Sequence, residues 1–383
     1  MESNVAVFFG GQSCEHDISI LTGIQVLHNL DPSHNIYPIY IHSGGIWYTG
    51  RRLWDISSYA DFDPKRLKLK KVCVLPYDTR LFELRGRRLK PICEIDCAVL
   101  AMHGINGEDG SLAGLLQLSG IPQTSTNVLG GALGMDKIAM KVFFEGLGLK
   151  VLPYTYFERR QYMYEQEKTL QSIEEALGYP VIVKPSMLGS SIGIKVCSSR
   201  QELIEGIETA IRFDRRVLVE RAEEEFIEIN CAAFKTCGAI RATECERPIS
   251  WRHFLSFEDK YLGGEKGMAS AGREFPADID EEISDRIKEI TKKIYRSLNL
   301  KGVVRADFIV SDDIYINEIN TIPGSLSFYL WEHEGITFTK LLDMMIKEAR
   351  EDHRDFKKCA YSFKSPALSL WSGGQKSPKL KKN

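Results

Sequence analysis

The segment from 301 to 324 carries the residue types that hold metal ions and phosphate groups. It reads KGVVRADFIV, a short SDD turn and then YINEINTIPG, which predicts two strands joined as a hairpin. Alternate side chains of a strand share a face, so Arg305 and Asp307 project together, as do Glu318 and Asn320. Carboxylate and amide oxygens suit magnesium, and a guanidinium suits a phosphoryl group. The hairpin therefore predicts a metal and phosphate site, and the alternative is an edge hairpin with a solvated charged face.

A glycine- and serine-rich turn between two further strands predicts a phosphate-binding loop. In PVIVKPSMLGSSIG, Lys184 ends a strand, and Ser190 and Ser191 lie in the turn that follows. Glycines let backbone N–H groups approach a phosphate, and the lysine adds a point charge. The pattern is not a Walker loop, because the lysine precedes the glycines. The alternative to a phosphate-binding loop, for this segment alone, is a turn that only joins the two strands of a hairpin.

Further cations lie on separate segments, outside any basic run. They are Lys137 in GMDKIAMK, Lys260 in FEDKYLGG and Arg305. Taken separately, each of these residues is more often a surface charge. A nucleotide triphosphate with magnesium requires both cations and carboxylates, so the combined pattern favours a nucleotide site. The Gly/Ala/Ser-rich stretch 262–273 is predicted to be a lid that excludes water, with a loop of no function as the alternative.

Two glycine-rich turns near the amino terminus place polar groups after predicted strands. They are FFGGQSCEHDIS, with Glu15, and AMHGINGEDG, with His103. Ligands of open α/β sheets bind at the carboxyl ends of strands. Glu15 is thus a candidate for holding a substrate ammonium and His103 for holding a carboxylate. The alternative is that Glu15 only favours a helix start while His103 is a satisfied turn residue.

Composition excludes several classes of protein. The chain has 383 residues, 43% of them hydrophobic, which predicts two or three globular domains. A formal net charge of −2 provides no broad basic field for nucleic acid or for an anionic membrane. The sequence shows no signal peptide and no apolar run of about 20 residues, so we expect a cytoplasmic protein. Nine scattered cysteines without a CxxC pair argue against a zinc site or a disulfide framework.

The predicted fold class is α/β, with an α+β carboxy-terminal part. Strands at 4–10, 36–42 and 95–102, with a helix at 18–30, predict a Rossmann-like first domain. The basic insert 46–93 is predicted to be a hairpin with a solvated face. The predicted divisions of the chain are 1–129, 130–216, 217–352 and a disordered basic tail, 353–383.

The motifs together resemble the D-alanine:D-alanine ligase family of the ATP-grasp superfamily over about residues 4–350. The resemblance rests on FGGQSCEHDIS, MHGINGEDGSLAGLLQLSGIP, MDKIAMK, PVIVKPSMLGSSIG, KYL, GVVRADFIV and NEINTIPG, in that family's order. It implies a Rossmann-like substrate domain followed by a two-domain ATP-grasp fold. It also implies a homodimer that supplies peptidoglycan precursors in the cytoplasm.

The resemblance carries roles to individual residues. Glu15 resembles the residue that holds the ammonium of the first D-alanine, linked through Ser190 to the lid tyrosine, here Tyr261. Arg305 and the backbone N–H of Gly324 resemble the oxyanion donors. The remaining positions are the phosphate ligands Lys137, Lys184 and Lys260, the nucleotide-binding residues Ser190, Ser191, Glu220 and Glu228, the substrate residue His103, and the metal ligands Asp307, Glu318 and Asn320.

The implied reaction joins D-alanine to a second D-amino acid, most simply D-alanine, with ATP and magnesium, or manganese in its place. The γ-phosphoryl group activates a carboxylate as an acyl phosphate, which the second substrate's amine attacks. One position departs from the family: Tyr329 stands where a serine usually contacts the second substrate's carboxylate. A ligase with another acceptor, such as D-serine, D-lactate or another amine, is therefore an alternative. An inactive nucleotide-binding regulatory protein is a further alternative.

Overall fold

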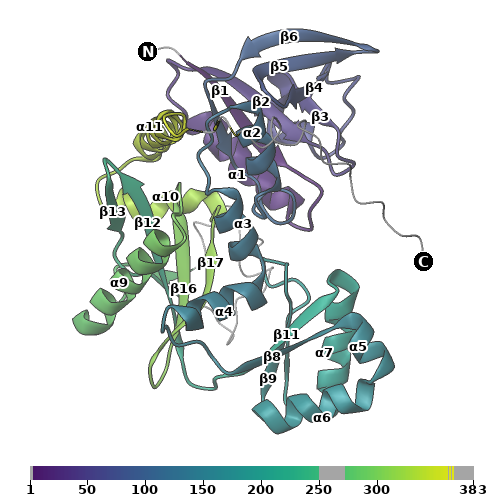
Figure 1. Ribbon diagram of the computed structural model, residues 1–383, viewed down its shortest axis with the longest axis vertical. Helices are drawn as coiled ribbons and strands as arrows, with labels where there is room; N and C mark the ends of the chain where they lie inside the picture. Colours follow the sequence, from purple (N-terminus) through teal and green to yellow (C-terminus); the bar gives the residue numbers. More distant parts are fainter. Residues whose placement is uncertain (1–2, 250–271, 361, 364, 366–383) are drawn as a thin grey trace, which may run out of the picture.

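The computed structural model describes residues 3–249, 272–360, 362–363 and 365, and these residues build three separate sheets with helices packed on them (Figure 1). A fourth, two-stranded sheet lies beside the third. Within the described part of the chain, no helix is long and apolar enough to cross a membrane.

The amino-terminal part contains the predicted parallel strands. β1 (Asn4–Gly10) lies between β2 (Asn35–Ile41) and β7 (Cys97–Leu100) and is parallel to both. β1 is almost wholly buried, as expected of a parallel strand covered on both faces. The helices after its strands are α1 (His16–Asn29) and α2 (Ser111–Ser119). The predicted Rossmann-like βα arrangement is thereby observed.

The insert at 46–93 is larger than the predicted hairpin. Its strands extend the first sheet in the order β6-β5-β4-β3-β2, and each pair is antiparallel. None of its residues lines either pocket described below. Its elements are β3 (Trp47–Thr49), η1 (Arg51–Trp54), η2 (Ile56–Ser58), β4 (Lys70–Leu75), β5 (Asp78–Arg85) and β6 (Arg88–Glu94).

The second sheet is four-stranded and antiparallel, in the order β10-β9-β11-β8. The predicted boundary near 217 falls inside β11, which pairs with both β8 and β9, so it would cut this sheet. We therefore place the division between β11 and the next strand. The elements are β8 (Tyr154–Glu158), α5 (Arg159–Tyr164), α6 (Gln166–Leu177), β9 (Val181–Pro185), β10 (Lys195–Cys197), α7 (Arg200–Phe213) and β11 (Arg216–Arg221).

The third sheet contains the predicted hairpin. β16 (Val304–Val310) and β17 (Ile314–Asn320) pair so that Asp307 lies opposite Glu318, and Phe308 then lies opposite Ile316. This irregularity leaves Asn317 as an additional residue, and it keeps both Asn317 and Glu318 partly exposed. The sheet order is β13-β12-β16-β17, with β12 (Ile227–Thr236) and β13 (Ala239–Ala242).

Helices on this sheet bring distant segments to the hairpin. α3 (Val128–Met135) and α4 (Lys137–Gly146) contact β17. On the sheet, α9 (Glu281–Ser297) buries Ile287 and Ile294, which lie on one face of the helix. Asp136 caps α4 by accepting hydrogen bonds from the N–H groups of the first turn, so the chain enters this helix at a defined angle.

The last helix belongs to the first core. α11 (Phe338–Phe356) packs on β7, β12 and α1. Helix α11 continues to Phe356, so the predicted tail from 353 begins too early. Arg354 in its last turn favours this continuation, because a cation stabilises a helix carboxyl end. The remaining elements are β14 (Arg247–Pro248), β15 (Arg273–Glu274), η4 (Gly324–Ser327) and α10 (Phe328–Glu332).

Candidate functional site

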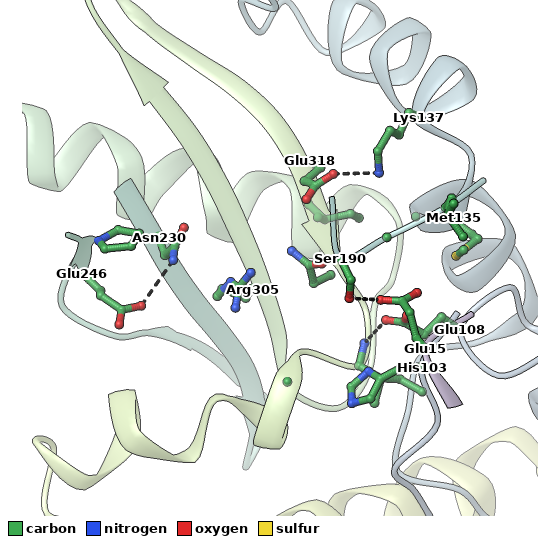
Figure 2. Close-up of a pocket in the computed structure, with 18 of the residues that line it drawn as sticks. Glu15, His103, Glu108, Met135, Lys137, Ser190, Asn230, Glu246, Arg305 and Glu318 are labelled. Atoms are coloured by element: carbon green, nitrogen blue, oxygen red, sulfur yellow. Dashed lines mark hydrogen bonds and ion pairs between the residues drawn. The ribbon is translucent and has the colours of Figure 1, made fainter. Parts of the chain in front are cut away.

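Two adjoining pockets lie where the three sheets meet. They share residues from α4, from the turn after β9 and from the hairpin, so the two form one continuous site. Figure 2 shows the first pocket, with Glu15 and His103 on one side and Asn230 and Glu246 on the other. The shared lining residues are Lys137, Leu188, Gly189, Ser190, Asn230, Pro248, Arg305 and Glu318.

The hairpin residues converge as predicted and pair with one another. Arg305 donates two hydrogen bonds to Asp307, of 2.6 Å from Nε and 2.7 Å from a terminal nitrogen. Asn320 donates from Nδ2 to the same carboxylate at 2.8 Å. Burial disfavours the charge on Arg305, but Asp307 outweighs burial and raises its pKa well above the ordinary value. The solvated-face alternative is wrong, because these side chains face the pocket.

Lys137 and Glu318 form a second pair in the same place, 2.8 Å apart. Lys137 begins α4 and reaches β17 across the pocket, as Figure 2 shows. Burial works against its charge, yet the Glu318 carboxylate raises the pKa of Lys137. A candidate phosphate ligand is thus neutralised by a candidate metal ligand.

A buried ion triad adjoins the second pocket, which one of its members, Lys184, lines. Glu220 of β11 forms ion pairs with both Lys141 of α4 and Lys184 of β9, and all three side chains are almost fully buried. Burial raises the pKa of Glu220, but the two lysines outweigh this and lower it to about 2. Lys184 also lies 3.4 Å from Asn317 Oδ1. Lys141 and Asn317 are site residues that the sequence patterns did not single out.

The donor set of the hairpin suits a divalent cation. Asp307 and Glu318 face each other on paired strands, and the Asn320 amide belongs to the same cluster. Two carboxylates and an amide oxygen fit magnesium, which completes its shell with water and substrate phosphates. Among the described residues, no group of three His, Cys, Asp or Glu side chains could hold a metal. The predicted ligand set, which includes an asparagine, stays a prediction.

Glu15 and the glycine-rich turn meet across two sheets. The Ser190 hydroxyl donates a hydrogen bond to Glu15 Oε1, and the dashed line in Figure 2 marks it. Glu15 makes no side-chain cap for α1 and is 5% exposed, so it does more than favour a helix start. Ser190 and Ser191 both have positive φ, 52° and 57°. Non-glycine residues in this conformation are uncommon, and they cluster at functional turns.

Two buried titratable groups lie beside Glu15. His103 is hydrogen-bonded to Thr22 at 2.9 Å, and burial lowers its pKa to about 4. Burial, reinforced by Glu15, raises the pKa of Glu108 to about 8. Glu108 accepts hydrogen bonds from Gly104 N at 2.8 Å and from Ile322 N at 3.3 Å, which anchors both loops. The His103 imidazole is therefore uncharged at neutral pH.

The turn after β17 is backbone-strained. Residues Ser325, Leu326 and Ser327 all have positive φ, between 47° and 53°. Such a run in non-glycine residues is held by its surroundings. Thr22 accepts a hydrogen bond from Ser325 N at 3.3 Å, and this contact ties the turn to α1. The strained turn thereby places Gly324 in the lining of the first pocket.

The far end of the first pocket is built mostly by residues that the sequence patterns did not indicate; the exceptions are Tyr329 and Arg273, the last residue of the predicted lid stretch. Glu246 is 3% exposed and accepts hydrogen bonds from Asn230 at 3.3 Å and from the Tyr329 hydroxyl at 3.4 Å. Arg273 pairs with Glu246 at 3.2 Å, and its guanidinium carbon lies 4.0 Å from the Tyr329 ring centroid. These residues come from separate strands and turns, and no short motif contains them.

The remaining predicted positions divide into two groups. Ser191 and Glu228 line the second pocket, together with Lys184. Lys260, Tyr261 and the lid stretch up to 271 lie outside the described residues.

Comparison with known proteins gives matches along most of the chain. The family model for the D-ala D-ala ligase N-terminus matches residues 4–126, and the model for the C-terminus matches residues 143–347. The D-alanine–D-alanine ligase of Thermosipho melanesiensis is 38% identical over 355 residues, which cover 92% of this chain and 95% of that protein. The Bacillus cytotoxicus protein of the same name is 32% identical over 368 residues, with 94% and 98% covered.

Solved structures share the arrangement. The D-alanine-D-alanine ligase from Coxiella burnetii superposes with a TM-score of 0.77 at 25% identity, covering 97% of this chain and 98% of that one. The VanG D-Ala:D-Ser ligase from Enterococcus faecalis has a TM-score of 0.76 at 29% identity, with 91% and 100% covered. The site described above thus lies on a fold that relatives with two different named acceptors share.

Proposed function

The chain belongs to the D-ala D-ala ligase family, and we propose that it is an ATP-dependent ligase that joins D-alanine to a second D-amino acid. The observation that carries this proposal is the continuity of the two pockets. One is lined by Lys184 and Glu228, the other by Glu15 and His103, and Arg305 lines both. A nucleotide's terminal phosphate and an amino acid's carboxylate can therefore meet at one place.

The side of the site near Glu15 suits the first substrate. Glu15 is a buried carboxylate held by Ser190, which supports its proposed pairing with the ammonium of D-alanine. His103 is a neutral donor close by. The second pocket supplies the cations that a triphosphate needs, Lys137 and Lys184.

The proposed chemistry activates a carboxylate before it meets an amine. An oxygen of the D-alanine carboxylate forms a bond to the γ-phosphorus as the bond to the β-phosphate oxygen breaks, which releases ADP. The acceptor amine then attacks the carbonyl carbon, the C–O bond to the phosphate breaks, and the amine loses a proton. Arg305 and the N–H of Gly324 are the proposed donors to the oxygen that gains negative charge, where a positioned donor has its greatest effect.

The family implies a divalent metal, and we propose magnesium, with manganese as a substitute. Asp307, Glu318 and Asn320 would hold it, and when bound it would neutralise charge on the phosphates. Here the protein's own part is to keep these oxygens on two paired strands, within reach of Lys137 and Arg305.

The test is phosphate release from ATP and magnesium, first with D-alanine alone and then with a panel of second D-amino and D-hydroxy acids. Products are identified by mass. Dialanine from D-alanine alone would establish the ordinary ligase. Phosphate release only with another acceptor, such as D-serine or D-lactate, would identify that acceptor as the second substrate. No phosphate release with any acceptor would contradict ligase activity.

Assembly and location remain proposals. The family resemblance supports a homodimer, which light scattering on the purified chain would test. We propose a cytoplasmic site of action, as the family resemblance implies, and fractionation of cells would test it.

A further inference from the structure

Arg273 lies at the end of the first pocket that is far from Glu15. It pairs with Glu246, and Figure 2 shows Glu246 and Glu15 on opposite sides of Arg305. We propose that Arg273, held on the ring of Tyr329, binds the carboxylate of the acceptor amino acid and thereby selects acceptors that carry one. This inference rests on the proposed ligase function and names a residue that determines its second substrate.

Two contacts hold the Arg273 guanidinium, and a strand pairing places its backbone. Its carbon lies 4.0 Å from the centroid of the Tyr329 ring, within the range of a cation–π interaction. One terminal nitrogen lies 3.2 Å from Glu246 Oε1. The backbone of Arg273 pairs with Pro248 between β14 and β15. A guanidinium fixed in this way loses less conformational freedom when it binds a ligand than a mobile one would.

The charge of Glu246 does not cancel the role of Arg273. Glu246 is 3% exposed and accepts hydrogen bonds from Asn230 and Tyr329 as well as pairing with Arg273, so its oxygens are engaged on the protein side. The Arg273 side chain is 23% exposed, so it is the more accessible member of the pair. A guanidinium presents five N–H donors, so it can contact Glu246 and a ligand carboxylate at the same time.

The two ends of the pocket then match the two ends of a dipeptide. Glu15 provides a negative group at one end, and Arg273 provides a positive group at the other. The second guanidinium of the site, Arg305, is already forked to Asp307 and lies between them. A dipeptide product carries an ammonium at one terminus and a carboxylate at the other, so this polarity sets the direction in which the acceptor binds.

The experiment compares D-alanine with D-alaninamide as the acceptor. D-alaninamide has no carboxylate, so it cannot be activated and reports on the acceptor position only. Both acceptors are offered with D-alanine, ATP and magnesium, and the dipeptide and dipeptide amide are quantified by mass. For Arg273→Gln, we expect kcat/KM for acceptor D-alanine to fall about 10- to 100-fold, the effect of losing a hydrogen bond to a charged group. Turnover of D-alaninamide should stay within about twofold.

Two further variants separate binding from folding. Arg247→Gln is the matched control, because Arg247 pairs with Glu274 at 3.8 Å on the same two-stranded sheet but does not line the pocket. Arg247→Gln should leave the ratio of the kcat/KM values for D-alanine and D-alaninamide unchanged. Arg273→Lys keeps the charge without the fork and should recover part of the preference. Calorimetry measures the affinity of each variant for ATP. An affinity equal to that of the wild type shows that the site is folded.

The outcomes are distinct. Selective loss of the D-alanine acceptor in Arg273→Gln supports the inference. An equal loss of both acceptors, or no loss of either, overturns it while the ligase function stands. A wild-type protein that forms neither product overturns the proposed function, and the inference fails with it.

Discussion

Lys137 and Glu318 lie in direct ion-pair contact, with 2.8 Å between Nζ and Oε2. The first is a candidate phosphate ligand, and the second is a candidate metal ligand. Arg305 and Asp307 repeat this relationship at 2.6 Å on the same hairpin. The cations and carboxylates of the site therefore neutralise one another. A triphosphate that draws the cations away leaves the carboxylates uncompensated unless a divalent metal binds with it.

Nucleotide binding should consequently depend on the metal. We expect the Kd for ATP to rise at least about tenfold when magnesium is replaced by EDTA, since at least one charge-assisted contact is lost. Calorimetric titration in both buffers measures this change. Glu318→Gln should narrow the difference, because one of the two uncompensated carboxylates is then absent. Equal affinities of the wild type in both buffers would contradict the coupling.

Arg305 is the candidate for stabilising the oxyanion. Arg305→Ala should lower kcat roughly 100-fold or more, since removing one such donor costs about 2.7–4 kcal/mol. Steady-state phosphate release measures kcat, and Arg305→Lys is the control that retains a charge. An unchanged kcat in Arg305→Ala would remove this role.

Tyr329 should influence the acceptor more than the nucleotide. Its ring lies under Arg273 and lines the first pocket but not the second, so Tyr329→Ser removes the support of that guanidinium. We expect a changed ratio of products with competing D-amino acids and a Kd for ATP within about threefold of the wild type. Competition assays with mass detection measure the ratio. An equal effect on ATP binding would count against this expectation.

In the buried triad, removing the charge of Glu220 should destabilise the protein more than removing the charge of Lys141. Glu220→Gln leaves Lys141 and Lys184 buried without their shared anion, and we expect a loss of roughly 3–5 kcal/mol in the free energy of unfolding. Lys141→Met should cost less, because Glu220 and Lys184 remain as a balanced pair. Urea denaturation measures the free energy of unfolding of both variants. A larger loss for Lys141→Met than for Glu220→Gln would contradict the role of Glu220 as the shared anion.

His103 should make the protein sensitive to acid. Burial lowers its pKa from 6.5 to about 4, so the unfolded chain binds the extra proton first as pH falls. The free energy of unfolding should decrease between about pH 6.5 and about pH 4, by on the order of 2–3 kcal/mol more than in His103→Gln. Denaturation curves across this range measure the slope. Parallel slopes for the wild type and the variant would exclude His103 as the cause.

Local sequence patterns accounted for the units of this fold. Strand periodicity predicted the hairpin that carries Arg305 and Glu318, and glycine turns after strands predicted the positions of Glu15 and Ser190. Periodicity misplaced the division near 217, because whether the strand 216–221 joins the second or the third sheet depends on partners far away in the chain.

The sequence by itself determined which side chains can do chemistry, since residue types and their spacing within one strand or turn are local properties. Only the tertiary structure decided which of them neutralise one another and which face the acceptor end. Lys137 meets Glu318, and Arg273 meets Glu246 and Tyr329, through the packing of helices and strands from separate segments. Such contacts depend on packing between distant segments, and no spacing along the chain records them.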